Sequence, residues 1–410
     1  MNLFVRFWAC SYLGILLITA VNPIIFDTSL LATVKYLFPI LGLIVNILII
    51  VKSSSVYKIS TEFQFILGFI LLLMISLVVT SDFVESFLRV IFAATSLMYI
   101  YTATLLDKRL LESVLQFLYW LSIGIIVWCY YLLVFYPLDY FNSGNFRGIF
   151  YNANYLGTIL TFASVPAILL RLHSKDRPQK SFKYVNYALI IAALFLLIVT
   201  RSRASILALF VLLVVIYLFK DRRVLKNALV FGLSCVLFGI ITYAVMPERA
   251  TLDLYKNYIL KYDSSESISS SRGNMYADRI LGIAAKPGFG WGYGIKPQLT
   301  NSLTGVEKLN DTEKGNSYLA VIEEIGVWMG VMFLLIFFMV IFQCVRYTAF
   351  TSGAYRRASG ISLGIIFAGV VHANFESWLF YYGSFIANYY WLTLLSHRSL
   401  RNSPARSEQL

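Results

Sequence analysis

Residues 184–219 read YVNYALIIAALFLLIVT-RSR-ASILALFVLLVVIYLF, two apolar runs separated by Arg201, Ser202 and Arg203. Each run approaches the roughly 20 residues that a helix needs to cross the hydrocarbon core of a bilayer. Two arginines in the middle of one lipid-exposed span would be costly, because charged groups lose their hydration there. The stretch therefore predicts two neighbouring transmembrane helices joined by a very tight turn.

The same alternation of apolar runs and short polar interruptions extends along the chain. Of its 410 residues, 59% are hydrophobic and 13% are charged, whereas about a quarter of the residues are charged in soluble domains. The sequence predicts an all-α, polytopic membrane protein with one membrane domain over residues 1–410 and about twelve spans. These spans are 7–26, 30–51, 63–81, 86–106, 114–136, 155–172, 184–200, 204–219, 228–246, 317–345, 359–375 and 378–395.

The distribution of lysine and arginine predicts the orientation of these spans. With the N-terminus inside, the inner segments hold 20 of these residues, the short outer connections five, and a long outer loop, residues 247–315, the other nine. Short cytoplasmic loops carry such an excess of basic residues. We therefore expect both termini in the cytoplasm. Because topology accounts for most of the net charge of +13, we expect no nucleic-acid partner.

Unusual polar residues collect on the predicted outer side. They are Arg147, Asn152, Asn154, Arg201, Arg203, Arg272, Asn316, Glu323, Glu324 and His372. A guanidinium group stays charged near a low-dielectric boundary and donates two parallel hydrogen bonds, which suits a diphosphate. Several arginines that meet in one outer pocket would hold a lipid-linked pyrophosphate and neutralise its charge as it leaves. The alternative is that these arginines bind lipid headgroups or cap helices.

The span that follows the long outer loop contains two adjacent carboxylates. Asn316 or Ser317 can cap its first turn, and Glu323 and Glu324 would lie about 10–12 Å below that start, given a rise of 1.5 Å per residue. Intramembrane carboxylates are candidates for function. One of them could instead pair with an outer arginine for structural reasons only.

Two further features of the outer side are open to more than one interpretation. His372 is the one histidine predicted to lie outside, and a histidine at a helix end is often structural. The run Gly288-Phe289-Gly290-Trp291-Gly292-Tyr293-Gly294 predicts a loop that turns tightly beneath the membrane domain, although its rings could also stack on sugars. Because Asp311-Thr312-Glu313 is very weak evidence for a metal site, we predict no metal.

Taken together, these segments resemble the O-antigen ligase and O-antigen polymerase (Wzy-type) family of bacterial membrane glycosyltransferases. The resemblance rests on Arg147-Gly148 followed by residues 152–157 (NANYLG), on residues 201–205 (RSRAS) opening a span, on the glycine run 288–294, and on residues 316–319 (NSYL) followed by Glu324, Gly326 and Gly330. Each motif is short, and their order and spacing on a frame of about twelve spans is the more specific signal.

The resemblance implies a GT-C-like, all-helical enzyme of the bacterial cytoplasmic (inner) membrane. Such enzymes transfer a glycan from undecaprenyl diphosphate to an acceptor hydroxyl at the outer face, with inversion and without a metal, nucleotide or other cofactor. By matching motif positions, Arg147 with Arg201 or Arg203 would bind the diphosphate, with Arg272 beside them. Asn154 and Asn316 would position the substrate. Expected partners are the lipid-linked oligosaccharide, the acceptor glycan, membrane lipid, a chain-length regulator and a flippase.

One position departs from the pattern of the ligases. Ligases carry a catalytic histidine immediately before the Asn-Ser-x-Leu segment, where this chain has Gly315. Glycine cannot accept a proton, so the catalytic candidates here are Glu323, Glu324 and His372. The departure favours a polymerase of surface polysaccharide repeats over a ligase that transfers the glycan to lipid A core. A transporter of anions or glycans is the alternative of another class, although transporters usually bind substrate near the bilayer midplane.

Overall fold

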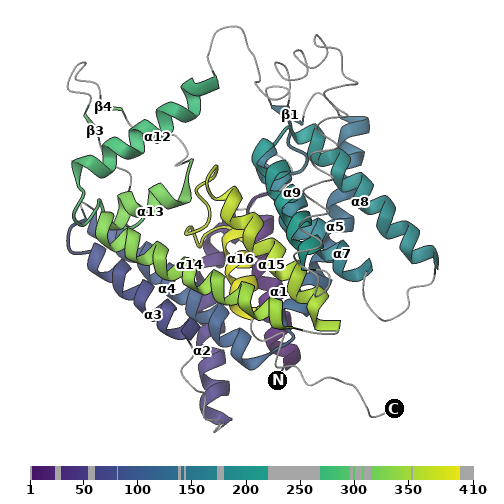
Figure 1. Ribbon diagram of the computed structural model, residues 1–410, viewed down its shortest axis with the longest axis horizontal. Coiled ribbons are helices and arrows are strands. Elements are labelled where there is room, and N and C mark those ends of the chain that lie inside the picture. The colour runs from purple at the N-terminus through teal and green to yellow at the C-terminus, as the bar shows by residue number, and fades with distance from the viewer. Residues whose placement is uncertain are drawn as a thin grey trace.

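A computed structural model describes residues 2–23, 29–53, 61–80, 82–136, 140–142, 145–172, 180–219, 268–295, 299–300, 307–308, 315–351 and 354–397. Nearly all of the regular structure in these ranges is helical (Figure 1). The helices of the first half are α1 (Asn2–Ile18), α2 (Ser29–Lys52), α3 (Thr61–Ser76), α4 (Phe83–Leu106), α5 (Leu110–Phe135), α6 (Ala153–Ile159), the π-helical turn η1 (Leu160–Ser164), α7 (Val165–Leu172), α8 (Lys180–Thr200) and α9 (Arg203–Leu218).

The second half adds five helices to this bundle, and each half contains one pair of short strands. The helices are α12 (Ile268–Ala285), α13 (Ser317–Ile325), α14 (Val327–Phe350), α15 (Ala354–His372) and α16 (Phe385–Ser396). Strands β1 (Phe141–Asn142) and β2 (Asn145–Phe146) form one antiparallel hairpin, and β3 (Leu299–Thr300) pairs antiparallel with β4 (Glu307–Lys308). The all-α class expected from the sequence is therefore the observed class, since the strands are two residues long.

Packing places the last helices at the centre of the bundle. α15 lies against α9, and α16 packs on α4 and α15, while α2 covers another side of α4. α16 is buried over its whole length, including the large side chain of Trp391. Phe337 and Phe380 contact that indole with tilted rings, and Phe333 packs edge-on against Phe380. Because this helix has no lipid-facing side, the bundle is built around it.

The expected number of spans is not reached in the described part of the chain. Six helices there are long and apolar enough to cross a membrane, namely Thr33–Lys52, Phe83–Leu106, Leu110–Phe135, Ala153–Leu172, Phe182–Thr200 and Val327–Phe350. Shorter apolar helices cover Asn2–Ile18, Glu62–Ser76 and Arg203–Leu218. α16, with 12 residues, falls short of the roughly 20 that a bilayer requires. The span predicted over 228–246 lies outside the described residues.

The tight turn predicted between residues 184–200 and 204–219 is present. α8 ends at Thr200, α9 begins at Arg203, and Arg201 between them adopts a positive φ of 51°. That conformation is uncommon for a residue with a side chain. It lets the chain reverse in two residues, and the two arginines end up exposed at the turn.

The span predicted over residues 317–345 is two helices rather than one. α13 ends at Ile325, Gly326 has φ 88° and ψ 164°, and α14 begins at Val327. This backbone conformation is essentially restricted to glycine. The segment of residues 287–292 enters the break, so that Trp291 N–H donates to the Glu323 carbonyl and Gly292 N–H to the Glu324 carbonyl, at 3.1 and 2.9 Å.

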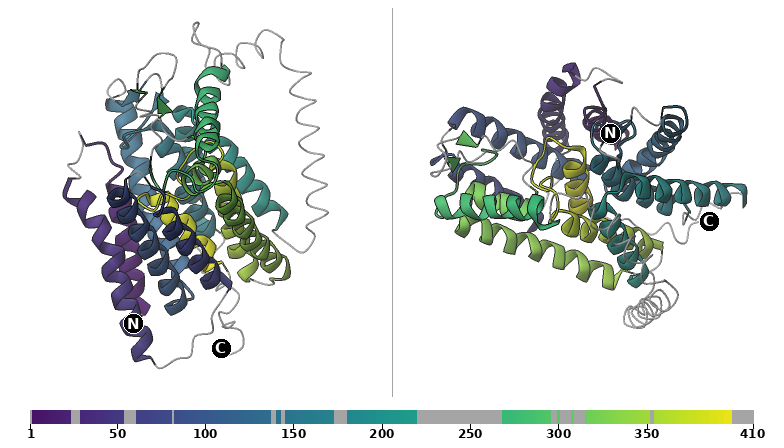
Figure 2. Two further views of the ribbon diagram at one scale, coloured as in Figure 1. Left: turned by 90° about the vertical axis from the view of Figure 1, so that its left-hand side faces the viewer. Right: turned by 90° about the horizontal axis from the view of Figure 1, so that it is seen from above.

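The segments predicted to lie outside gather at one end of the helices. The hairpins β1–β2 and β3–β4 and helix α12 lie at the end opposite to the start of α1 (Figures 1 and 2). Residues 268–285 of the predicted long outer loop form α12, which packs on α13. This arrangement matches the predicted grouping of the loops. The cytoplasmic position of the termini stays a prediction.

The break at Gly326 gives a stability prediction. A Cβ atom at this position would lie 2.1 Å from the Gly288 carbonyl oxygen, so Gly326→Ala would add a clash to a strained backbone. We expect it to lower the free energy of unfolding by at least about 1–3 kcal/mol, measured as a lower melting temperature of the purified protein in detergent. Gly68→Ala in α3 is the control, because a Cβ there meets no atom within 4 Å. An unchanged melting temperature for Gly326→Ala would contradict this account of the break.

Candidate functional site

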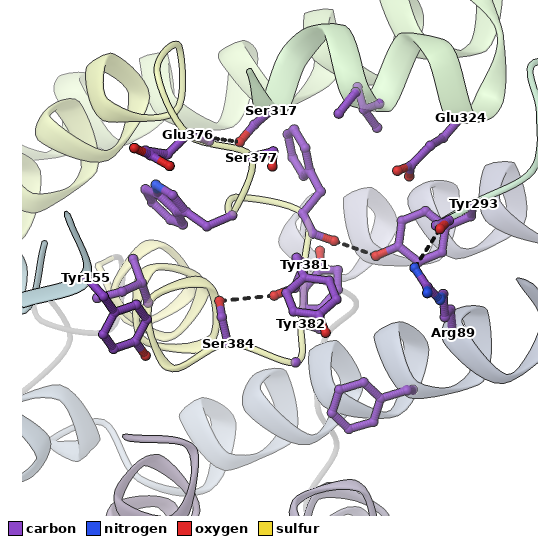
Figure 3. A pocket seen from close by; sticks show the side chains of 18 of the residues that line it. Arg89, Tyr155, Tyr293, Ser317, Glu324, Glu376, Ser377, Tyr381, Tyr382 and Ser384 are labelled. Carbon is purple, nitrogen blue, oxygen red and sulfur yellow. Dashed lines mark hydrogen bonds between the residues drawn. The ribbon is translucent and has the colours of Figure 1, made fainter. Parts of the chain in front are cut away.

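A cavity of about 770 Å³ opens between α4, α6, α13 and the turn that joins α15 to α16. α2 and α4 form one wall, α6 another, and the α15–α16 turn runs along the cavity with many aromatic side chains. Figure 3 shows Glu376, Ser317 and Ser377 on one side, Glu324, Tyr293 and Arg89 on the other, and Tyr381 and Tyr382 between them. The lining also includes Tyr36, Glu85, Phe92, Tyr151, Asn152, Asn154, Tyr155, Thr158, His372, Trp378, Phe380 and Ser384.

The side of the cavity at Glu376 is built by hydrogen bonds from three separate elements. Ser317 at the start of α13 donates its N–H to the Ala373 carbonyl at 2.9 Å and its hydroxyl to the Glu376 carbonyl at 2.7 Å. The side-chain amide of Asn154, on α6, donates to Glu376 Oε1 at 3.1 Å. These bonds fix both the backbone and the carboxylate of Glu376 against α6 and α13.

Asn316 performs the capping role expected for it. Its side-chain oxygen accepts hydrogen bonds from the N–H groups of Tyr318 and Leu319, at 2.8 and 3.0 Å, and its amide group donates to the Asn374 carbonyl at 3.1 Å. The side chain therefore starts α13 and ties that start to the α15–α16 turn. Gly315 precedes it with φ 51°, a conformation that is uncommon for residues with a side chain. Asn316 is not among the residues that line the cavity, but it holds the start of α13 against the turn that does.

His372 ends α15 and uses both of its ring nitrogens in hydrogen bonds. Nδ1 accepts from the indole N–H of Trp378 at 2.8 Å, which assigns the ring proton to Nε2. Nε2 lies 3.3 Å from the hydroxyl of Thr158 on α6 and 3.3 Å from that of Ser205 on α9. The side chain is 1% exposed. The ring of His372 therefore links α15 to α6 and α9.

The opposite side of the cavity is built around Tyr293, from the glycine run. Its backbone carbonyl accepts from the Ser86 hydroxyl at 3.1 Å, and its own hydroxyl donates to the Phe380 carbonyl. Arg89 donates to the Gly294 carbonyl and forms an ion pair with Glu85. Burial raises the pKa of Tyr293 well above its ordinary value, the nearby Glu324 raises it further, and Arg89 opposes both. Tyr293 is therefore a neutral hydrogen-bonding group beside Glu324.

The glycine run behaves as the predicted tight loop. Three of its four glycines, Gly290, Gly292 and Gly294, lie where neighbouring atoms leave no room for a side chain. A Cβ at Gly290 would lie 2.5 Å from the Glu324 carbonyl oxygen, and one at Gly294 would lie 2.3 Å from the Arg89 side chain. The close approach of this loop is what brings the Tyr293 ring to the cavity.

Glu323 and Glu324, adjacent in sequence, face different surroundings. Glu324 lines the cavity and is 7% exposed. Glu323 is fully buried and accepts a hydrogen bond at Oε2 from Arg279 of α12, with 2.6 Å between the atoms. A Cβ atom at Gly282 of α12 would lie 2.2 Å from Glu323 Oε1, so α12 and this carboxylate are in close contact. The alternative of a structural ion pair therefore applies to Glu323. Its partner, Arg279, is not one of the arginines singled out from the sequence.

The arginines predicted to bind a diphosphate are not among the described residues that line the cavity. Arg147 is partly buried and directly follows β2, which packs on α8. Arg201 and Arg203 are exposed at the turn after α8. Among the described residues, the arginine that lines the cavity is Arg89. Arg272 falls within α12, and its side chain lies outside the described residues.

Sequence reasoning missed Arg89 and Glu376 as cavity residues. Both are visible in the sequence as charged residues at the edges of predicted spans, Arg89 near the start of 86–106 and Glu376 directly after 359–375. The missing information was the fold of the α15–α16 turn and of the glycine loop, which bring these residues to the same cavity as Asn154 and Glu324. The tyrosines of residues 381–382 carried no periodic pattern that could single them out.

Comparison with known proteins gives one family match. The model of the O-antigen ligase family matches residues 188–327, from α8 through the start of α14. No curated protein matches the chain. The match supports the O-antigen ligase and polymerase family, and with it a glycosyltransferase-like role in membrane glycan processing. The apolar helices and this match together indicate a membrane protein.

The buried pair Arg279–Glu323 gives a test of its structural role. Arg279→Met would leave the Glu323 carboxylate buried without this partner, which typically costs about 3–5 kcal/mol. We expect a large drop in the melting temperature, with partial recovery in Arg279→Met/Glu323→Leu, in which both charges are removed. Glu324→Gln is the matched comparison and should melt close to the unmodified protein, because Glu324 faces the cavity. If Arg279→Met melts like the unmodified protein, the pair does not hold α12 on α13.

Proposed function

We propose that the protein polymerises undecaprenyl-diphosphate-linked oligosaccharide repeats into a surface polysaccharide at the outer face of the cytoplasmic membrane. The donor would be the growing lipid-linked chain, and the acceptor a sugar hydroxyl on a second lipid-linked repeat. The single observation that carries the proposal is the cavity of about 770 Å³. The segment matched by the O-antigen ligase family contributes Tyr293, Gly294, Ser317 and Glu324 to its lining, and residues outside that segment supply most of the rest.

The size and lining of the cavity support a glycan as the substrate. Binding sites for small molecules usually occupy about 300–1,000 Å³ and combine aromatic walls with a few well-placed polar groups. Here Tyr155, Tyr293, Tyr381 and Tyr382 supply flat apolar surfaces and hydroxyl groups. Tyrosine combines a ring that packs against an apolar face with a polar tip. Such walls suit sugars, whose rings have apolar faces and hydroxyl edges.

The arginines next to the cavity support a diphosphate donor. Arg203 begins α9, and Ser205 two residues later contacts His372 at the Glu376 side of the cavity. Arg201 and Arg203 are exposed, so a lipid-linked diphosphate could reach them from the membrane surface. Together with Arg147 and Arg272 they would neutralise the charge that develops on the departing diphosphate. No step in this reaction requires a metal.

The proposed reaction is a single displacement at the anomeric carbon of the donor. The acceptor hydroxyl oxygen forms a bond to that carbon, and the bond from the carbon to the diphosphate oxygen breaks. The diphosphate leaves with the bonding electron pair, and the hydroxyl proton passes to a base. Direct displacement inverts the anomeric configuration. The arginines stabilise the leaving group, and the cavity holds the acceptor hydroxyl close to the anomeric carbon in the correct orientation.

A carrier-lipid glycan profile of a deletion strain tests the proposed function. We expect single lipid-linked repeats to accumulate and long chains to disappear, since chain extension is the step removed. Long glycans that remain on the carrier without reaching their final acceptor would indicate a ligase instead. Normal polymer together with loss of radiolabelled uptake in vesicles would indicate a transporter.

Substitution of the exposed arginine pair tests the proposed donor site. Arg201→Ala/Arg203→Ala should abolish long chains on a glycan gel, because each lost donor to a developing anion typically costs about 10²–10³ in rate. Arg346→Ala is the control, since Arg346 is exposed on α14 and does not line the cavity. Unchanged chain length in a well-expressed double variant would remove the two arginines from the donor site.

A further inference from the structure

Three carboxylates line the cavity, and they differ in how they are held. Glu85 is 48% exposed and forms an ion pair with Arg89. Glu324 lies on the same side, near Arg89 and Tyr293, on helix α13. Glu376 stands on the other side of the cavity, apart from Arg89 (Figure 3). It belongs to the turn between α15 and α16 rather than to a helix.

Hydrogen bonds to three separate elements, α6, α13 and α15, fix the position of Glu376. Its amide N–H donates to the His372 carbonyl at 3.2 Å, and its carbonyl accepts from the Ser317 hydroxyl. Its Oε1 accepts from Asn154 of α6. A reactive group performs best when its geometry is locked by surrounding hydrogen bonds in this way. The orientation of the carboxylate is therefore set before substrate arrives.

Glu376 also lies on the side of the cavity that adjoins the proposed donor arginines. His372 begins the same turn and contacts Ser205, close to the start of α9 with Arg203. α9 and α15 pack along each other. The anomeric carbon of a donor whose diphosphate rests on Arg201 and Arg203 would therefore enter the cavity at the Glu376 side. The Glu324 side is left for the more distant sugars of the bound glycan.

From this placement we propose that Glu376 is the base that accepts the proton of the acceptor hydroxyl, with Asn154 as its positioning residue. The inference rests on the proposed function and assigns a role within that reaction. The acceptor oxygen forms its bond to the anomeric carbon while its proton moves to a carboxylate oxygen of Glu376. The electron pair of the broken bond leaves with the diphosphate, and the arginines neutralise the charge of this leaving group. Glu324, with Arg89 and Tyr293, binds the glycan.

Steady-state kinetics on the purified protein with a synthetic polyprenyl-diphosphate-linked repeat test this assignment. Glu376→Gln should lower kcat by about 10²–10⁴, the usual contribution of a general base, with little change in KM. Glu324→Gln should instead raise KM. Asn154→Ala should lower kcat less than Glu376→Gln does, because it removes only the group that orients the base. Glu112→Gln, on α5 outside the cavity lining, should behave as the unmodified enzyme.

The pH profile separates a catalytic role from a structural one. In the unmodified enzyme kcat should fall as the pH is lowered and the base becomes protonated, and Glu376→Gln should lose this acidic limb. Glu376→Asp keeps a carboxylate and should retain the acidic limb at a lower kcat. If Glu376→Gln folds poorly, the Glu376→Asp variant still tests whether Glu376 is the base. The assignment is overturned if either Glu376 variant keeps the unmodified kcat, or if the limb disappears in Glu324→Gln instead. Failure of the unmodified protein to extend any chain would overturn the proposed function itself.

Discussion

The architecture of the cavity depends on one exchange of backbone hydrogen bonds. In an unbroken helix the carbonyls of Glu323 and Glu324 would accept from residues four positions later. Here they accept from Trp291 and Gly292, and the Val327 N–H turns to the Pro287 carbonyl. An unpaired backbone group inside a membrane costs several kcal/mol. The glycine loop and the break at Gly326 therefore require each other, and they form together or not at all.

That exchange has consequences on both sides of the broken helix. It ends α13 after nine residues, one residue beyond Glu324, which lines the cavity. It also brings Tyr293 to the cavity wall, where its hydroxyl bonds to the Phe380 carbonyl of the α15–α16 turn. The other end of α13 is tied to the same turn through Ser317. Helix α13 is thus connected to the α15–α16 turn near both of its ends, and this fixes one side of the cavity.

The α15–α16 turn similarly connects several helices on the side of the cavity at Glu376. His372 ends α15 just before this turn and contacts α6 and α9. Within the turn, Glu376 contacts α6, and Trp378 donates to the ring of His372. The π-helical turn η1 follows α6 directly, and its Thr161 hydroxyl donates to the Ser205 carbonyl at 3.1 Å. Such turns are frequent at functional sites. The hydrogen bonds among α6, η1, α9 and α15 therefore meet at Ser205 and His372.

The amino-acid sequence by itself determined the helical class, the predicted grouping of polar loops, the reversal at Arg201 and the cap at Asn316, because each follows from local hydropathy or from contacts within a few residues. It also supplied Asn154, Glu324 and His372 as candidates that the cavity contains. Only the tertiary structure decided that Glu323 pairs with Arg279, that residues 317–345 break at Gly326, and that Glu376 and Arg89 line the same cavity. Those outcomes depend on contacts between segments far apart in sequence, such as Asn154 with Glu376, and hydropathy and periodicity carry no information about which distant segments will meet.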